Sequence, residues 1–137
     1  MTSSDKEPLL RLEHVNVAFP VKKDFPFQKQ RFVRAVTDVS IDIYPGETFG
    51  VVGESGCGKS TLANTTLGMQ RVNSGKIFFD GEELTAMNTK QLKEARRHMQ
   101  MIFQDPFSSL NPRFSVFDLI SEPLRTKGGY SYAQQRA

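Results

Sequence analysis

The nine residues GESGCGKST, positions 53–61, are the part of the chain whose residue types and spacing could do chemistry. They fit the pattern G-x-x-x-x-G-K-[ST]. A phosphate chain is bulky and highly charged, so the backbone must curl around it and aim several N–H groups inward. Side chains larger than hydrogen at Gly53, Gly56 and Gly58 would obstruct that arrangement. The pattern therefore predicts a loop that binds the phosphates of a nucleotide.

The side chains that follow the last glycine have separate expected roles. Lys59 should reach the β- and γ-phosphates, and the Ser60 hydroxyl should ligate Mg²⁺. Thr61 should contact the α-phosphate. A helix that begins here would also point its N-terminus, with about half a positive charge, at the anion. The predicted nucleotide-binding loop consists of Gly53, Glu54, Ser55, Gly56, Cys57, Gly58, Lys59, Ser60 and Thr61.

A phosphate-binding loop needs a strand before it and a helix after it. Residues 48–53, TFGVVG, are continuously apolar and predict a strand that is buried on both faces. Residues 60–69 predict a helix that stops near Gly68, with its apolar positions at Leu62, Ala63 and Leu67. The order of strand, glycine loop and helix makes an accidental match to the pattern improbable.

Other elements follow from alternation, periodicity and turn residues. Residues 9–19 alternate apolar and polar side chains, and the prolines of residues 20–31 are typical of a connecting loop. The predicted elements are strands over 9–19, 34–43 and 77–79, a turn at Asp80-Gly81, a helix from Asn88 or Thr89 to Arg97, a strand over 99–103, and beyond Gln104 a loop, a short helix and the start of another helix.

Composition limits the class of protein. A chain of 137 residues has room for one domain, and it contains no apolar run that could span a bilayer. The N-terminus has no apolar segment typical of a signal peptide, and the single cysteine, Cys57, fits a reducing compartment. Cys57 is expected to serve as a small residue in the loop, with a redox role as the alternative. The net charge is +3 and the basic residues are mixed with acids, so KEARRH at 93–98 is interpreted as a solvated helix face rather than a nucleic-acid patch.

A second stretch, MIFQDPFSSLNPR at 101–113, identifies the kind of nucleotide-binding protein by resemblance. Together with residues 33–64, VNSGKIFFDGEEL at 72–84 and ISEPLR at 120–125, it resembles the ATP-binding subunits of ABC transporters. The similarity is greatest to the oligopeptide and dipeptide permease type and runs from Leu9 to Arg125.

The resemblance implies an α/β fold, the N-terminal part of the P-loop NTPase core of an ABC ATPase, with an antiparallel β segment. Residues 9–105 would belong to the ATP-binding core and residues 106–137 to the start of the helical subdomain. Gln104 matches the glutamine that approaches Mg²⁺ and the attacking water, so the implied metal ligands are Ser60 and Gln104 and the implied catalytic residues are Lys59 and Gln104. Phe19 is the best match for the aromatic residue that stacks on adenine, and Phe25, Phe27 and Phe32 compete for that role.

The implied function is that of a subunit that couples the binding and hydrolysis of ATP, with Mg²⁺, to the import of peptides. Its expected partners are transmembrane permease subunits, a second ATPase subunit arranged head to tail and, indirectly, a solute-binding protein, but no nucleic acid. Its expected place is the cytoplasmic face of the membrane. The family's signature sequence and catalytic glutamate are not found before Ala137, so this stretch is expected to bind ATP without turnover. The alternatives are a non-hydrolytic nucleotide-binding module and an importer of another small solute such as nickel. A GTPase is less favoured because no sequence that reads guanine is present, and a small kinase is less favoured because nothing after the phosphate loop resembles a lid for a phosphate acceptor.

Overall fold

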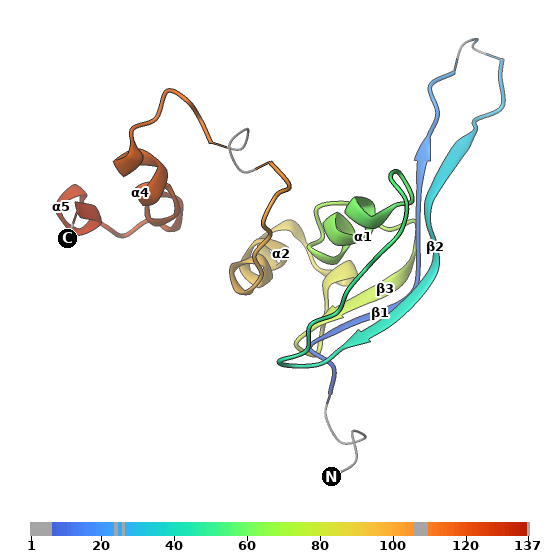
Figure 1. Ribbon diagram of the computed structural model, residues 1–137, viewed down its shortest axis with the longest axis horizontal. Coiled ribbons are helices and arrows are strands. Elements are labelled where there is room, and N and C mark those ends of the chain that lie inside the picture. Colours follow the sequence, from blue (N-terminus) through green and yellow to red (C-terminus); the bar gives the residue numbers. More distant parts are fainter. Residues whose placement is uncertain (1–6, 24, 26, 106–109, 137) are drawn as a thin grey trace. The chain divides into compact units, whose positions relative to one another are not determined.

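A computed structural model describes residues 7–23, 25, 27–105 and 110–136. The chain divides into two compact units, Met1–Met99 and Gln100–Ala137, and each is described by itself (Figure 1). The division falls a few residues before the boundary of 105/106 that the resemblance implies between the core and the helical subdomain.

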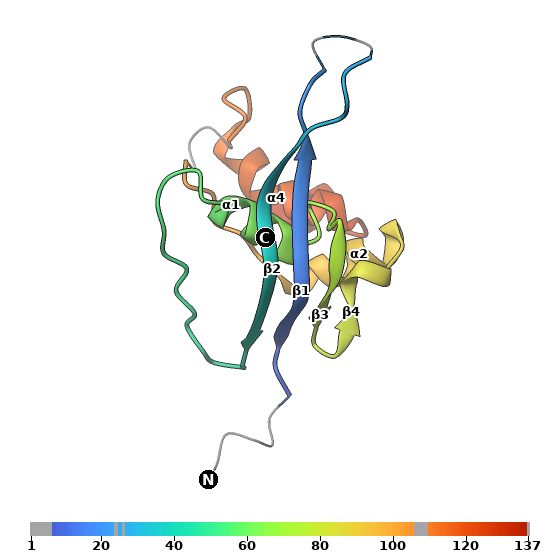
Figure 2. The ribbon, with the colours of Figure 1, turned by 90° about the vertical axis from the view of Figure 1, so that its right-hand side faces the viewer.

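The first unit is built on an antiparallel sheet of four strands in the order β2-β1-β3-β4 (Figure 2). Its strands are β1 (Leu10–Pro20), β2 (Phe32–Ile43), β3 (Ser74–Phe79) and β4 (Glu82–Glu83). The strands predicted over 9–19, 34–43 and 77–79 are therefore confirmed. Asp80 and Gly81 join β3 to β4 with φ angles of 50° and 79°, which are the two positive values of a tight hairpin turn.

Two facing β-bulges keep the apolar residues of the long strands on the core side. The buried positions change from even to odd numbers between Leu12 and Val15, which would place them on opposite faces of a regular strand. His14, with a φ of 50°, lies at the bulge in β1, where one extra residue is inserted. Asp38, with a φ of 49°, lies at the neighbouring bulge in β2. Their side chains meet at 2.8 Å between His14 Nδ1 and Asp38 Oδ1. A bulge inserts one residue and so restores the alternation.

Short helices pack on one side of this sheet. They are α1 (Lys59–Thr66), η1 (Leu84–Ala86), α2 (Thr89–Ala95) and η2 (Arg96–His98). Asn88 caps α2 by accepting hydrogen bonds from the N–H groups of Lys90 and Gln91, and the Gln91 side chain accepts one from the Asn88 N–H, which completes a capping box. The buried apolar core consists of Leu12, Val15, Val17, Val36, Ile77 and Leu84.

The strands predicted over 48–53 and 99–103 are wrong for this structure, because neither segment forms a strand. Val52 is 93% exposed and Ile102 is 94% exposed, although both have the apolar character of a buried strand. Parallel strands of an α/β sheet need hydrogen-bonded neighbours and helices on both faces. The sheet of the first unit provides no hydrogen-bonded neighbour for either segment, since its four strands pair only with one another.

The second unit contains α4 (Val116–Lys127) and α5 (Tyr132–Arg136). This confirms the two helices predicted beyond Gln104, whereas part of the predicted loop, residues 106–109, lies outside the described residues. Ser115 is the N-cap of α4 and forms a capping box with Asp118. Hydrogen bonds from the Ser115 hydroxyl and, to a smaller extent, from the Arg125 guanidinium lower the pKa of the Asp118 carboxyl. Among the described residues, no helix has both the length and the apolar character needed to cross a bilayer.

Candidate nucleotide-binding site

The predicted phosphate loop lies between an extended segment and the start of α1, which begins at Lys59. Gly58 is the N-cap residue and has a φ of 100°. A Cβ atom built on Gly58 would lie 2.1 Å from the backbone oxygen of Ala35 in β2. Only glycine satisfies both conditions, because L residues avoid this φ and the obstacle is backbone rather than a flexible side chain. β2 therefore fixes the place where α1 begins.

The glycine before the loop is also packed closely. A Cβ atom on Gly53 would lie 2.7 Å from the sulfur of Cys57, so the loop folds back on itself across these two residues. Gly56 has a φ of 81° with nothing within 4 Å of its Cβ position. The predicted obstruction therefore holds for Gly53 and Gly58, whereas Gly56 has open space and its positive φ is the reason that glycine suits it.

The start of α1 leaves backbone donors available. No side chain caps it, and helix geometry leaves its first N–H groups without an acceptor inside the helix. The first hydrogen bond of the α type runs from the N–H of Leu62 to the Gly58 oxygen at 2.8 Å. The N–H groups of Lys59, Ser60 and Thr61 therefore precede the helical ladder, in the position where an anion binds at a helix N-terminus.

The Lys59 ammonium group lies inside the curl of the loop. Its Nζ atom donates to the carbonyl oxygens of Gly53 at 2.8 Å and Glu54 at 2.6 Å, and it lies 3.5 Å from the sulfur of Cys57. The positive charge thus bonds to the loop itself. An ammonium carries three donors on a flexible stem, so Lys59 can exchange these neutral acceptors for charged phosphate oxygens without a change in the backbone.

The hydroxyl residues of the helix face different surroundings. Ser60 is exposed, whereas Thr61 is half-buried. Thr65 lies one turn later, is fully buried and donates its hydroxyl to the Thr61 oxygen at 2.6 Å. This last bond secures the first turn of α1 from within the protein.

Arg96 holds the other end of α1, which sequence reasoning missed. Its guanidinium donates to the carbonyl oxygens of Leu67 at 2.8 Å and Gly68 at 2.5 Å. The interpretation of 93–98 as a solvated face is therefore wrong for Arg96, which is half-buried, although Arg97 beside it is exposed. Carbonyl groups at a helix C-terminus lack partners and carry partial negative charge, so a cation there stabilises the helix. The spacing of RRH could not reveal which arginine turned inward.

Removing this clamp should weaken α1 and the loop that precedes it. We expect Arg96→Met to cost about 1–3 kcal/mol of unfolding free energy, because the half-buried carbonyl groups of Leu67 and Gly68 lose their donor. Arg97→Met is the matched control, since Arg97 only bonds Glu94 across an exposed helix face at 2.8 Å, an interaction worth about 0.5 kcal/mol or less. Urea unfolding of the two variants measures the difference, and equal midpoints would contradict the clamp.

The predicted adenine-stacking residue lies on β1 close to the loop. Phe19 pairs with Val33 of β2, two residues along that strand from Ala35, the neighbour of Gly58. Phe19 is 37% exposed. Phe25 and Phe27 lie beyond the ends of both strands, which favours Phe19 over them. Phe32 pairs with Pro20 and stays a competitor.

Gln104 belongs to the second unit and is exposed. The structure of the first unit therefore does not test its predicted place beside the phosphates. Residues 106–109 of the QDPFSSLNPR motif lie outside the described residues. His14 and His98 are exposed, and no group of metal-ligating His, Cys, Asp or Glu residues occurs in the part of the chain that the structure describes.

The antiparallel sheet, its helices and the glycine loop define the class: an N-terminal part of a P-loop protein of the ABC ATPase type. Solved structures agree, since the dimeric ATP-binding cassette MJ0796 bound to ADP and Pi superimposes with a TM-score of 0.73 at 22% identity, over 93% of this chain and 52% of that one. The chain belongs to the ABC transporter family, which matches residues 36–137.

Relatives in this family are similar over most of the chain. The oligopeptide transport ATP-binding protein OppF of Haemophilus influenzae is 49% identical over 90% of this chain and 38% of its own length. AppF of Bacillus subtilis, another oligopeptide transport ATP-binding protein, is 39% identical over 98% of this chain and 41% of its own length. The glutathione import ATP-binding protein GsiA of Escherichia coli is 42% identical over 93% of this chain and 20% of its own length. The chain thus spans about two fifths of the length of the first two relatives.

Proposed function

We propose that this chain forms the nucleotide-binding part of the ATPase subunit of an ABC importer for peptides. The observation that carries the proposal is the loop of residues 53–61, curled around available backbone donors at the start of α1. Peptides are proposed as the cargo because two similar relatives are named for oligopeptide transport. The third is named for import of glutathione, which is itself a small peptide.

The loop residues fit a nucleotide. Gly53 to Thr61 would enclose the phosphates, with Lys59 on the β- and γ-phosphates, Thr61 near the α-phosphate, and Ser60 as a ligand of Mg²⁺. A Mg²⁺ ion held by Ser60 would supply positive charge that neutralises the charge developing on the phosphates. Phe19 would stack on adenine, and Gln104 is proposed as the second metal ligand and as the group that approaches the attacking water.

Residues 1–137 should bind Mg-ATP without steady release of phosphate. The roles assigned to Lys59, Ser60 and Gln104 supply charge and position, and none of them is that of a base. Complete hydrolysis is proposed for the whole subunit, paired head to tail with a second ATPase subunit. The dimeric structure of MJ0796 bound to ADP and Pi supports the pairing of two such subunits.

The proposed partners are the permease subunits of the transporter and, indirectly, a solute-binding protein. The proposed place is the cytoplasmic face of the membrane, where such a subunit would dock peripherally. The names of the relatives as transport and import proteins support both proposals.

The only cysteine of the chain provides a direct test of nucleotide binding. Cys57 is exposed and lies within the loop, so bound Mg-ATP should slow its alkylation by iodoacetamide in a saturable way. Mg-AMP should protect poorly, because it lacks the phosphates assigned to Lys59. Alkylation at an equal rate with and without Mg-ATP would contradict the proposal.

A further inference from the structure

The β1–β2 hairpin extends beyond the rest of the sheet as a two-stranded arm (Figures 1 and 2). Pairing of β1 with β3 reaches only Asn16, whereas pairing with β2 continues to Pro20 opposite Phe32. The far end of this arm carries exposed aromatic and basic side chains. This basic aromatic tip consists of Lys22, Lys23, Phe25, Phe27, Lys29 and Arg31.

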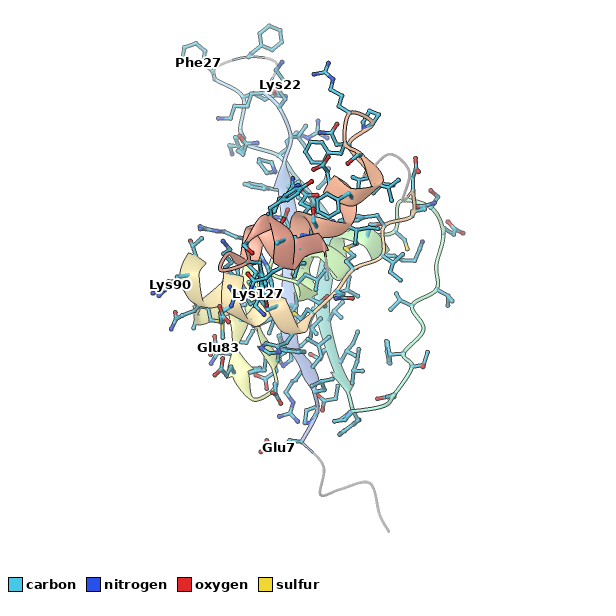
Figure 3. The ribbon with its side chains drawn as sticks, turned by 90° about the vertical axis from the view of Figure 1, so that its left-hand side faces the viewer. Glu7, Lys22, Phe27, Glu83, Lys90 and Lys127 are labelled. Atoms are coloured by element: carbon cyan, nitrogen blue, oxygen red, sulfur yellow. The ribbon has the colours of Figure 1, made fainter. Side chains whose placement is uncertain are left out.

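Hydrogen bonds hold the chain in the tip. The Val21 N–H donates to the Arg31 oxygen at 2.8 Å, and the Gln30 side-chain amide donates to the Val21 oxygen at 2.7 Å. Phe27 is nevertheless 98% exposed and Phe25 72% exposed. Figure 3 shows Phe27 and Lys22 at the end of the arm. Exposed apolar side chains that gather at one place indicate a contact surface.

We propose that the basic aromatic tip binds the surface of an anionic phospholipid membrane. Residues 20–32 contain four basic side chains and one acid, Asp24, so the segment has a positive charge that matches acidic head groups. Basic residues near such a surface each add to binding, and aromatic rings settle at the boundary between head groups and acyl chains. A narrow hairpin with phenylalanine at its end can place both kinds of side chain at that boundary together.

A nucleic acid is the main competing ligand, because it also attracts basic and aromatic residues. Proteins that bind single strands stack successive bases along a charged groove, whereas this tip is a projection. The preference for lipid rests on the proposed function, since a transport subunit works beside a bilayer. Membrane binding by the tip requires no nucleotide, so the two proposals can fail separately.

Tryptophan supplies a reporter for the test, because the chain contains none. A Phe27→Trp variant should show blue-shifted emission, and quenching by brominated lipid, with phosphatidylcholine vesicles that contain phosphatidylglycerol. It should show neither with phosphatidylcholine alone. Val116→Trp is the matched control for other apolar surfaces, since Val116 in α4 is 73% exposed and should be quenched little.

Charge variants test the electrostatic part. We expect Lys22→Gln/Lys23→Gln to lower the vesicle partition coefficient roughly 10- to 30-fold at low salt. Lys90→Gln/Lys93→Gln removes the same charge from α2, where Lys90 is labelled in Figure 3. This pair should change the partition coefficient less than about twofold. Three results would overturn the proposal. The first is an equal fall in the partition coefficient for the two lysine pairs, and the second is equal quenching at both tryptophan positions. The third is a shift of the Phe27→Trp emission with single-stranded RNA but not with anionic vesicles. Protection of Cys57 by Mg-ATP, followed in the same variants, should be unchanged and reports the nucleotide site separately.

Discussion

Replacing Gly58 with alanine is expected to lower the affinity of the chain for Mg-ATP by about 100-fold or more. The alanine would meet two obstacles together. Its φ of 100° costs about 1–3 kcal/mol for an L residue, and its Cβ atom would lie 2.1 Å from the backbone oxygen of Ala35. Since β2 cannot yield as a side chain can, the first turn of α1 must move, and with it the N–H groups assigned to the phosphates.

Two other glycines serve as graded controls for this prediction. Gly56 has a φ of 81° but open space around its Cβ position, so Gly56→Ala should bear strain without a collision and lose affinity less severely. Gly50 has open space and no positive φ, so Gly50→Ala should bind as the parent chain does. Calorimetric titration with Mg-ATP measures all three, and thermal melting checks that the sheet persists. An affinity for Gly58→Ala equal to that for Gly50→Ala would show that contact with β2 does not set the loop.

The local elements could be predicted because their signals lie within a few residues. The loop pattern includes the glycines that its curl demands, and the start of α1 falls at Lys59, within one residue of the predicted start. The Asp80-Gly81 turn and the Asn88 cap likewise follow from side-chain chemistry at single positions. Each of these signals can be read from a few neighbouring residues, even where β2 also restricts the start of α1 at Gly58.

The failures share a dependence on distant partners. Residues 48–53 have a strand's composition, but a strand also needs a neighbour, and no strand of the first unit pairs with them. Arg96 and Arg97 are the same residue type side by side, and only the position of the α1 C-terminus makes one of them a clamp. His14 and Asp38 gave no sign of facing bulges, because each bulge is defined by the opposite strand.

The Lys59 contacts connect the structure of the loop to its expected chemistry. A lysine that donates to two carbonyl groups of its own loop holds the curl of the backbone before any phosphate is present. The same ammonium supplies the charge assigned to the β- and γ-phosphates. Binding would therefore replace neutral acceptors by charged ones, and charge-assisted hydrogen bonds are the stronger kind.

Replacing Lys59 with alanine should consequently weaken the binding of ATP far more than the binding of AMP. We expect a loss of about 10- to 100-fold for Mg-ATP, since a hydrogen bond to a charged group contributes about 1.5–3 kcal/mol, and a loss of less than about threefold for AMP, which has no β- or γ-phosphate. Lys93→Ala, on α2, is the control for a change of net charge. Calorimetric titrations of both nucleotides separate the outcomes: equal losses for ATP and AMP would mean that Lys59 only maintains the shape of the loop, and no loss for either would exclude it from the phosphate site.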